Sequence, residues 1–256
     1  MSVELHDLIK ANLNLYAVLQ NLEELVRLDD EMAAKTGRWD VVIQFSVNHG
    51  PHAYLVFRDG VCTHEKGRHD SPHITLFFTS PRHFNAMFDG KAKPIPLKGF
   101  TRLGFLSREF APLTDRLAYY LKPEPARFSD PAFLKTNTIL TLHTAAFAAA
   151  ELAALEPESR RLGAHMGQGV LLIEVLADGP YAALSVENGA VSVSKERAER
   201  PRSKMSFKNL QVANDLLHGR VDSFSAVVRG DILLRGYMPL LDNANLILDR
   251  VRLYLS

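Results

Sequence analysis

Residues 206–255 read SFKNLQVANDLLHGRVDSFSAVVRGDILLRGYMPLLDNANLILDRVRLYL. The apolar spacing predicts a helix after Phe207 that ends at Gly219, because glycine suits the position just past a helix. Apolar residues then stand at every second position, at Phe224, Ala226 and Val228, which predicts a strand. A turn at Gly230-Asp231, a second strand, Gly236 and a closing helix complete a pattern that mixes helices with antiparallel strands.

A more divergent form of this pattern occurs earlier in the chain. Residues 84–106 read FNAMFDGKAKPIPLKGFTRLGFL, and their alignment pairs Gly90 with Gly219, Gly99 with Gly230 and Gly104 with Gly236. Pro94 and Pro96 interrupt the strand of this earlier copy, and proline cannot donate a hydrogen bond to a sheet. We therefore expect this strand to be shortened or to lie at a sheet edge.

Matches at a similar offset extend over most of the chain. GPHAYLVFRDG at 50–60 matches GPYAALSVENG at 179–189, and DRLAYYL at 115–121 matches DRVRLYL at 249–255. NLEELVRL at 21–28 corresponds to AAELAAL at 149–155. VIQFSV at 42–47 matches LIEVLA at 172–177 if one turn is a residue longer, Asn48-His49-Gly50 against Asp178-Gly179. Because the matches are collinear, the chain is predicted to be an internal duplication of a domain-sized unit.

The predicted domains are residues 1–124 and 128–256. Three prolines stand between 122 and 131, where they disfavour a continuous helix or strand. In the first copy we expect a helix over 5–34, strands over 41–47, 53–57, 61–65 and 74–78, and a helix over 81–90. In the second we expect strands over 190–194 and 204–207 and a helix over 207–219. Asp59-Gly60 and Asn188-Gly189 predict type I′ hairpin turns, whose two central residues have positive φ.

The glycine and apolar pattern of residues 206–255 resembles the sterol carrier protein 2 (SCP-2) sterol-transfer family, and the first copy resembles a divergent member. The resemblance implies an α/β fold of the α+β kind, with two SCP-2-like domains. Each would have a mixed, largely antiparallel five-stranded sheet covered by helices. Family members bind lipid-like ligands in an apolar tunnel between sheet and helices and have no catalytic residues of their own. Related domains also occur as accessory units attached to enzymes.

The resemblance also implies which residues would line such tunnels. The candidates are aromatic or aliphatic positions on the predicted strands and helices, namely Phe45, Phe57, Phe78, Phe84, Met87 and Phe88 in the first copy and Met205, Phe207, Leu216, Leu217, Phe224, Tyr237 and Met238 in the second. The same residues fit a filled core, because core and tunnel are both apolar. No cofactor and no metal are expected.

Composition narrows the class of protein. The 256 residues include 30 Lys+Arg against 29 Asp+Glu, a net charge of +1 that argues against a generic nucleic-acid binder. The single cysteine, Cys62, cannot form an internal disulfide. No signal peptide is evident at the N-terminus, and the apolar stretch 138–155 is short and polar for a membrane span. We expect a cytoplasmic protein.

Several residue groups suggest other chemistry. Six histidines lie between His49 and His83, and the spacings His49-X-X-His52 and His69-X-X-X-His73 suit either a metal site or solvated loops. Cys62 and His64 share a strand face, so they form either a nucleophile with its base or part of a core.

The basic loop 195–204 suits an anionic membrane surface or a solvated hairpin. The alanine-rich run 138–155 suits a buried helix or an interface between copies or chains.

Two hypotheses of function follow. The first is a non-enzymatic carrier of a lipid-like molecule, of the fatty acid, phospholipid or isoprenoid class, with transient membrane-surface contact. The second is an accessory or scaffolding protein whose cores are filled. A third hypothesis is that the protein is an enzyme. For the oligomeric state, a homodimer is one hypothesis.

Overall fold

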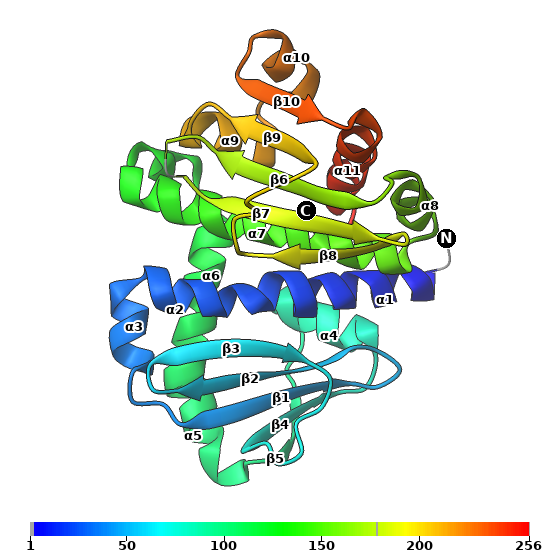
Figure 1. The fold of residues 1–256 in the computed structure, drawn as a ribbon. Helices are drawn as coiled ribbons and strands as arrows, with labels where there is room; N and C mark the ends of the chain where they lie inside the picture. The colour runs from blue at the N-terminus through cyan, green and yellow to red at the C-terminus, as the bar shows by residue number, and fades with distance from the viewer. Residues whose placement is uncertain (1–2, 178, 256) are drawn as a thin grey trace. The chain divides into compact units, whose positions relative to one another are not determined.

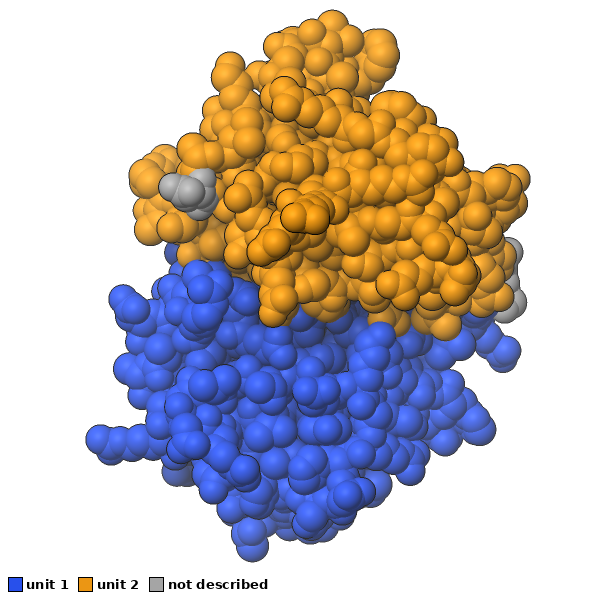
Figure 2. All heavy atoms as spheres, viewed as in Figure 1, with its two compact units in different colours: residues 1–122 blue, residues 123–256 orange. Residues whose placement is uncertain are grey.

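The computed structural model describes residues 3–177 and 179–255. The chain forms two compact units, Met1–Lys122 and Pro123–Ser256 (Figure 2). The division falls at the start of the segment 122–131 that contains three prolines, two residues before the predicted end of the first domain at residue 124. Asp178, from the turn that the duplication aligns with Asn48-His49-Gly50, lies outside the described residues.

Unit 1 has an α+β fold. Its helical and strand elements are α1 (Val3–Leu13), η1 (Asn14–Val18), η2 (Leu19–Asn21), α2 (Leu22–Leu28), α3 (Asp30–Thr36), β1 (Val41–Val47), β2 (His52–Arg58), β3 (Val61–Lys66), β4 (Ile74–Phe78), α4 (Pro81–Phe88), β5 (Ile95–Lys98), η3 (Phe100–Arg102), α5 (Leu103–Phe105), η4 (Leu106–Phe110) and α6 (Ala111–Leu121). The five strands form one sheet in the order β3-β2-β1-β4-β5. Only the β1–β4 pair is parallel, with Ile43 opposite Ile74.

Unit 2 repeats the order of the five strands and the helix before the last of them, with one added helix. Its elements are η5 (Pro125–Ser129), α7 (Pro131–Leu155), α8 (Pro157–His165), β6 (Gly169–Val175), β7 (Tyr181–Glu187), β8 (Ala190–Ser194), β9 (Ser203–Phe207), α9 (Leu210–Leu217), α10 (Ser223–Val228), β10 (Ile232–Gly236) and α11 (Met238–Val251). The sheet order β10-β9-β6-β7-β8 and the parallel β6–β9 pair match those of unit 1 (Figure 1). The two sheets therefore fit a tandem duplication, as the sequence predicted.

The turns that define the repeat have the predicted backbone. Asp59 and Gly60 have φ of 52° and 76°, and Asn188 and Gly189 have φ of 51° and 81°. Both central residues thus lie in the positive-φ region that a type I′ hairpin needs. The hairpins β2–β3 and β7–β8 keep their register through these turns, with Phe57 opposite Cys62 and Val186 opposite Val191.

The strand predicted around Phe224 is wrong. Residues 223–228 form the short helix α10, because the Asp222 side chain accepts a hydrogen bond of 2.8 Å from the Ser225 amide and caps the helix. The apolar residues follow a helical pattern, since Phe224 and Val228 are both exposed while Ala226 between them is buried. The single helix predicted over residues 5–34 is also wrong. The helical path is broken at Asp29, which has an extended backbone and caps the separate helix α3.

Helix α10 has no counterpart in unit 1, and this changes the alignment of the glycines. Gly99 directly follows β5, and a Cβ there would lie 2.8 Å from the His73 carbonyl oxygen. Gly236 ends β10, and a Cβ there would lie 2.3 Å from the Arg202 carbonyl oxygen. Gly99 therefore corresponds to Gly236, and the predicted pairs Gly99–Gly230 and Gly104–Gly236 are wrong.

The prolines of the first copy have the predicted effect. Strand β5 lies at the sheet edge and spans four residues, and its pairing with β4 shifts register between Thr75 and Leu76. Pro94 and Pro96 remove backbone donors on either side of Ile95, so the ladder there is short.

Helix α7 has the length and composition of a membrane-spanning helix, and 61% of its most apolar window is buried. It packs against β7, β8, α9 and α11 of its own unit (Figure 1). The alanine-rich run is thus a core helix of unit 2, and the interface hypothesis stays a prediction.

Candidate functional site

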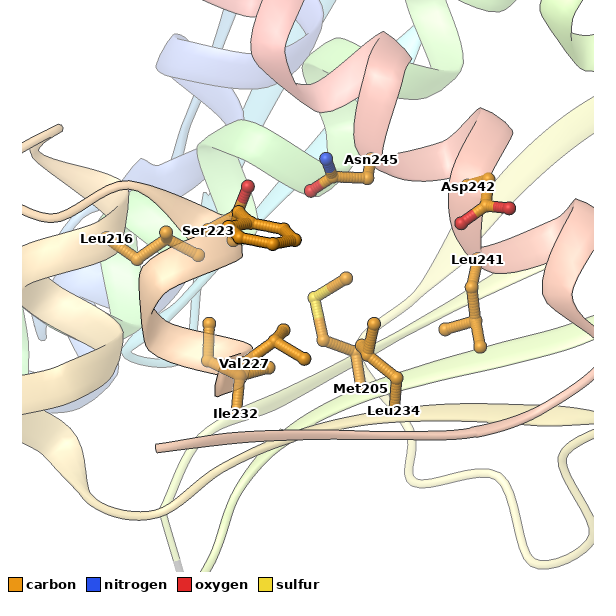
Figure 3. Close-up of a pocket in the computed structure, with 10 residues that line it drawn as sticks. Met205, Leu216, Ser223, Val227, Ile232, Leu234, Leu241, Asp242 and Asn245 are labelled. Atoms are coloured by element: carbon orange, nitrogen blue, oxygen red, sulfur yellow. The ribbon is translucent and has the colours of Figure 1, made fainter. Parts of the chain in front are cut away.

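An apolar pocket of about 200 Å³ opens in unit 2 between β9, β10 and three helices. Its lining residues come from five elements and are shown in Figure 3: Met205, Leu216, Ser223, Phe224, Val227, Ile232, Leu234, Leu241, Asp242 and Asn245. A cavity of about 150 Å³ is known to hold a benzene ring, so this one has room for a short hydrocarbon segment.

The buried part of the pocket is hydrocarbon and sulfur. Met205, Ile232 and Leu241 are 5%, 2% and 1% exposed. Met205 and Leu234 are paired across β9 and β10, so the sheet places them side by side. At the outer edge, the Phe224 ring is 77% exposed on α10. An apolar molecule would bury this ring and itself on entering, which is the source of hydrophobic binding free energy.

Three polar side chains complete the lining. Ser223 lies at the start of α10, and Asp242 and Asn245 lie three residues apart on α11, which puts them on neighbouring turns of one face. In Figure 3, Ser223, Asn245 and Asp242 lie on one side of the pocket and Met205, Ile232 and Leu234 on the other. The pocket is therefore amphipathic.

The structure brings together part of the predicted set in unit 2. Met205, Leu216 and Phe224 line the pocket, whereas Phe207, 2% exposed, is core. Leu217, Tyr237 and Met238 are not among the lining residues, and the Tyr237 ring lies against the Arg202 guanidinium at 3.9 Å.

Sequence reasoning missed seven lining residues, namely Ser223, Val227, Ile232, Leu234, Leu241, Asp242 and Asn245. The alternation of Ile232 and Leu234 and the helical spacing of Leu241, Asp242 and Asn245 were the signals that could have found five of them.

Four of the predicted residues of unit 1 are buried, and their rings pack against one another. Phe45, Phe57, Phe78 and Phe84 are each 2% exposed or less, whereas Met87 and Phe88 are half-buried. The rings pack edge to face, with centroids 4.8 Å apart for Phe78 and Phe84 and 5.2 Å apart for Phe84 and Phe88. Such contacts add to the stability that burial provides.

A buried carboxylate network recurs in both units. In unit 1, Arg116 Nε donates to Asp29 Oδ2 at 2.6 Å and Tyr120 Oη donates to it at 3.1 Å. In unit 2, Arg250 donates to both oxygens of Glu156 at 2.7 and 2.5 Å, and Tyr254 Oη donates to Oε1 at 3.0 Å. Arginine and tyrosine occupy the second and sixth positions of DRLAYYL and DRVRLYL. The repeat in sequence thus reflects a repeated structural anchor.

The network sets the protonation of its members. Burial raises the pKa of Glu156, but hydrogen bonds from Arg250, Ser159 and Tyr254 outweigh it and bring the pKa down from 4.5 to about 2. Burial and the Glu156 carboxylate together raise the pKa of Tyr254 to about 12. Burial also opposes ionisation of Asp29, yet its hydrogen bonds to Arg116 and the Met32 amide lower its pKa. Both carboxylates are therefore held ionised.

The basic loop 195–204 is tied to its own unit at two arginines. Arg197 donates to the buried Glu174 carboxylate at 2.5 Å, and Arg202 donates to the Gln168 carbonyl oxygen. In unit 1 the equivalent Gln44 accepts a hydrogen bond of 2.8 Å from the His69 amide. The two copies thus hold the same loop by different chemistry.

The histidines of unit 1 hydrogen-bond the backbone. His73, His83 and His69 each accept through Nδ1 from a backbone amide, those of Val42, Thr79 and Ser71. Over residues 3–177 and 179–255, no three His, Cys, Asp or Glu side chains gather as a metal site requires. Cys62 is buried opposite Phe57, as the core interpretation expects.

Comparison with known proteins finds similarity among solved structures. No family model matches, and no curated protein matches. A UbiJ-SCP2 ubiquinone synthesis protein is 16% identical over 40% of this chain and 87% of its own, with a TM-score of 0.33. A sterol carrier protein 2 crystal structure is 20% identical over 42% of this chain and 93% of its own, with a TM-score of 0.35.

A palmitated SCP2L2 from Aedes aegypti is 19% identical over 39% of this chain and 86% of its own, with a TM-score of 0.29. Several SCP2-domain structures are thus similar to this chain, each over about two-fifths of its length. This is the family that the glycine pattern of residues 206–255 resembles.

Proposed function

We propose that unit 2 binds a lipid-like hydrophobic molecule in the pocket between β9, β10, α9, α10 and α11, and holds it without chemical change. The observation that carries the proposal is the wall of the pocket, where Met205, Ile232, Leu234 and Leu241 present a continuous apolar surface beside an exposed Phe224. The family that the sequence resembles binds such ligands between sheet and helices, and this pocket is likewise lined by two strands and three helices. A cytoplasmic location is part of the proposal.

The first test asks whether the purified protein carries cargo. Extraction with organic solvent followed by mass spectrometry is expected to release a stoichiometric lipid. A neutral fluorescent apolar probe is then expected to bind the emptied protein at one site per chain, because the proposal places a single site in unit 2.

A matched pair of variants on α10 locates the site. Phe224 and Val228 are 77% and 70% exposed, but Phe224 lines the pocket and Val228 is not among the lining residues. We predict that Phe224→Glu weakens probe binding at least tenfold, while Val228→Glu binds like the wild type. Both should melt close to the wild type, because substitutions at exposed positions change stability little.

Three results would count against the carrier. Full-affinity binding by Phe224→Glu would place the ligand elsewhere. Unfolding of Phe224→Glu would show that the ring is structural. Absence of cargo together with absence of probe binding by the wild type would favour the accessory protein.

A second role is favoured for unit 1. Its predicted tunnel residues pack ring against ring, and residues 91–94 connect Gly90 to β5 without a helix like α10. We propose that unit 1 is an accessory domain with a filled core. A probe stoichiometry of two per chain would overturn this assignment.

A further inference from the structure

The polar side of the pocket bears on the head group of the cargo, an inference that rests on the proposed function. Among the lining residues, Asp242 is the charged one, and Ser223 and Asn245 are the other polar ones. Asp242 is exposed on α11. Within the described part of the chain, no hydrogen bond or ion pair involves its carboxylate, so both oxygens can accept from a ligand.

The two other polar groups also offer acceptors. The Asn245 amide nitrogen is directed to Asp249 Oδ2 at 3.5 Å, which leaves its Oδ1 available to a donor. A serine hydroxyl can accept as well as donate. Carboxylate, amide oxygen and hydroxyl together form an acceptor-rich, negatively charged rim above an apolar wall (Figure 3).

This combination selects by charge. A hydroxyl or ammonium head can donate to Asp242 while its chain lies on Met205 and Leu234. A carboxylate or phosphate head would bring a second negative charge beside Asp242 without a lysine or arginine among the lining residues to offset it. Two negative charges placed side by side at the pocket rim repel each other, and the repulsion weakens as salt is added.

We propose that the pocket selects single-chain lipids whose head group donates hydrogen bonds and carries no negative charge, such as long-chain alcohols and amines, and rejects the corresponding fatty acid anions. The selecting residue is Asp242, and the apolar wall supplies affinity common to all the chains.

The test compares three probes of one chain length on the full-length protein. Decan-1-ol, decylamine and decanoate compete with the neutral fluorescent probe at pH 7, with decan-1-ol kept below its solubility limit and the two ionic probes below their micellar concentrations. We expect decanol to bind at least tenfold more tightly than decanoate, which corresponds to about 1.4 kcal/mol. Decylamine should bind at least as tightly as decanol, and the gap between decanol and decanoate should narrow in high salt.

Asp242→Asn keeps the size of the side chain and removes its charge. The ratio of decanol to decanoate affinity should fall to about threefold or less, mainly because decanoate binds better, and decylamine should weaken. Glu187→Gln is the control, since Glu187 is also an exposed carboxylate of unit 2 but is not among the lining residues. It should keep the wild-type ratio.

The outcomes separate this inference from the proposed function. If none of the three probes competes and the fluorescent probe does not bind, the carrier itself fails. If decanoate binds the wild type as tightly as decanol, or if Asp242→Asn leaves the ratio unchanged, the pocket binds lipids but does not select the head group through Asp242.

Discussion

At the scale of single residues, two carboxylates hold the closing helices in place. Glu156 is 2% exposed and receives hydrogen bonds from Arg250, Tyr254 and Ser159. Asp29 has the same role in unit 1, where it also caps α3. A buried charge that loses its partner is costly, so these positions are sensitive to neutral substitution and to acid.

Glu156→Gln should lower the free energy of unfolding of unit 2 by about 2–3 kcal/mol, because it removes a charged acceptor from the partly buried Arg250. Urea unfolding at pH 7 measures the loss. Glu158→Gln is the control, since Glu158 pairs with Arg161 on the surface and its loss should matter little. Equal stability of the two variants would contradict the anchor role.

The same residue predicts an acid transition. The pKa of Glu156 in the folded protein is about 2, below its ordinary value of 4.5. The stabilising contribution is complete above pH 4.5 and declines as pH falls toward 2, because the unfolded chain then binds the proton more readily. Unfolding free energies measured between pH 6 and 3 should decline below pH 4.5, and less so in Glu156→Gln. A parallel decline in both proteins would remove Glu156 as a cause.

At the scale of elements, the end of the edge strand defines which glycines correspond. Gly236 has φ of 110°, and a Cβ there would meet backbone atoms at 2.3 and 2.7 Å. Gly104 lies in helix α5 with nothing within 4 Å of a Cβ. Helix α10 is inserted before β10, and this insertion shifts the alignment of the glycines between the two units. The same helix contributes Ser223, Phe224 and Val227 to the pocket.

We predict that Gly236→Ala destabilises unit 2 by about 2–4 kcal/mol, because neither the positive φ nor the adjacent backbone tolerates a methyl group. Gly104→Ala should be neutral or stabilise by up to about 1 kcal/mol, since alanine favours helix. Thermal melts of the two variants measure the difference. If Gly104→Ala instead destabilised unit 1 as strongly as Gly236→Ala destabilises unit 2, the result would support the alignment of Gly104 with Gly236.

At the scale of the whole molecule, each unit has its own sheet, helices and buried carboxylate. We predict that fragments 1–124 and 128–256 each fold alone, and that the second is the more stable because its edge strand lacks Pro94 and Pro96. Dispersed NMR spectra of both fragments and their urea midpoints are the measurements. Two unfolded fragments would mean that the units depend on each other for folding.

The sequence alone determined the duplication, the hairpin turns and the general fold class. These depend on local rules, such as positive φ at Asp59-Gly60 and proline at an edge strand, and each copy repeats them. Only the tertiary structure decided which apolar residues are core and which line a pocket. Phe207 and Phe224 are the same residue type, yet one is 2% and the other 77% exposed. That difference depends on the cap at Asp222, which turned a predicted strand into α10, and on the tertiary arrangement that places α10 and α11 at one pocket, which no local pattern encodes.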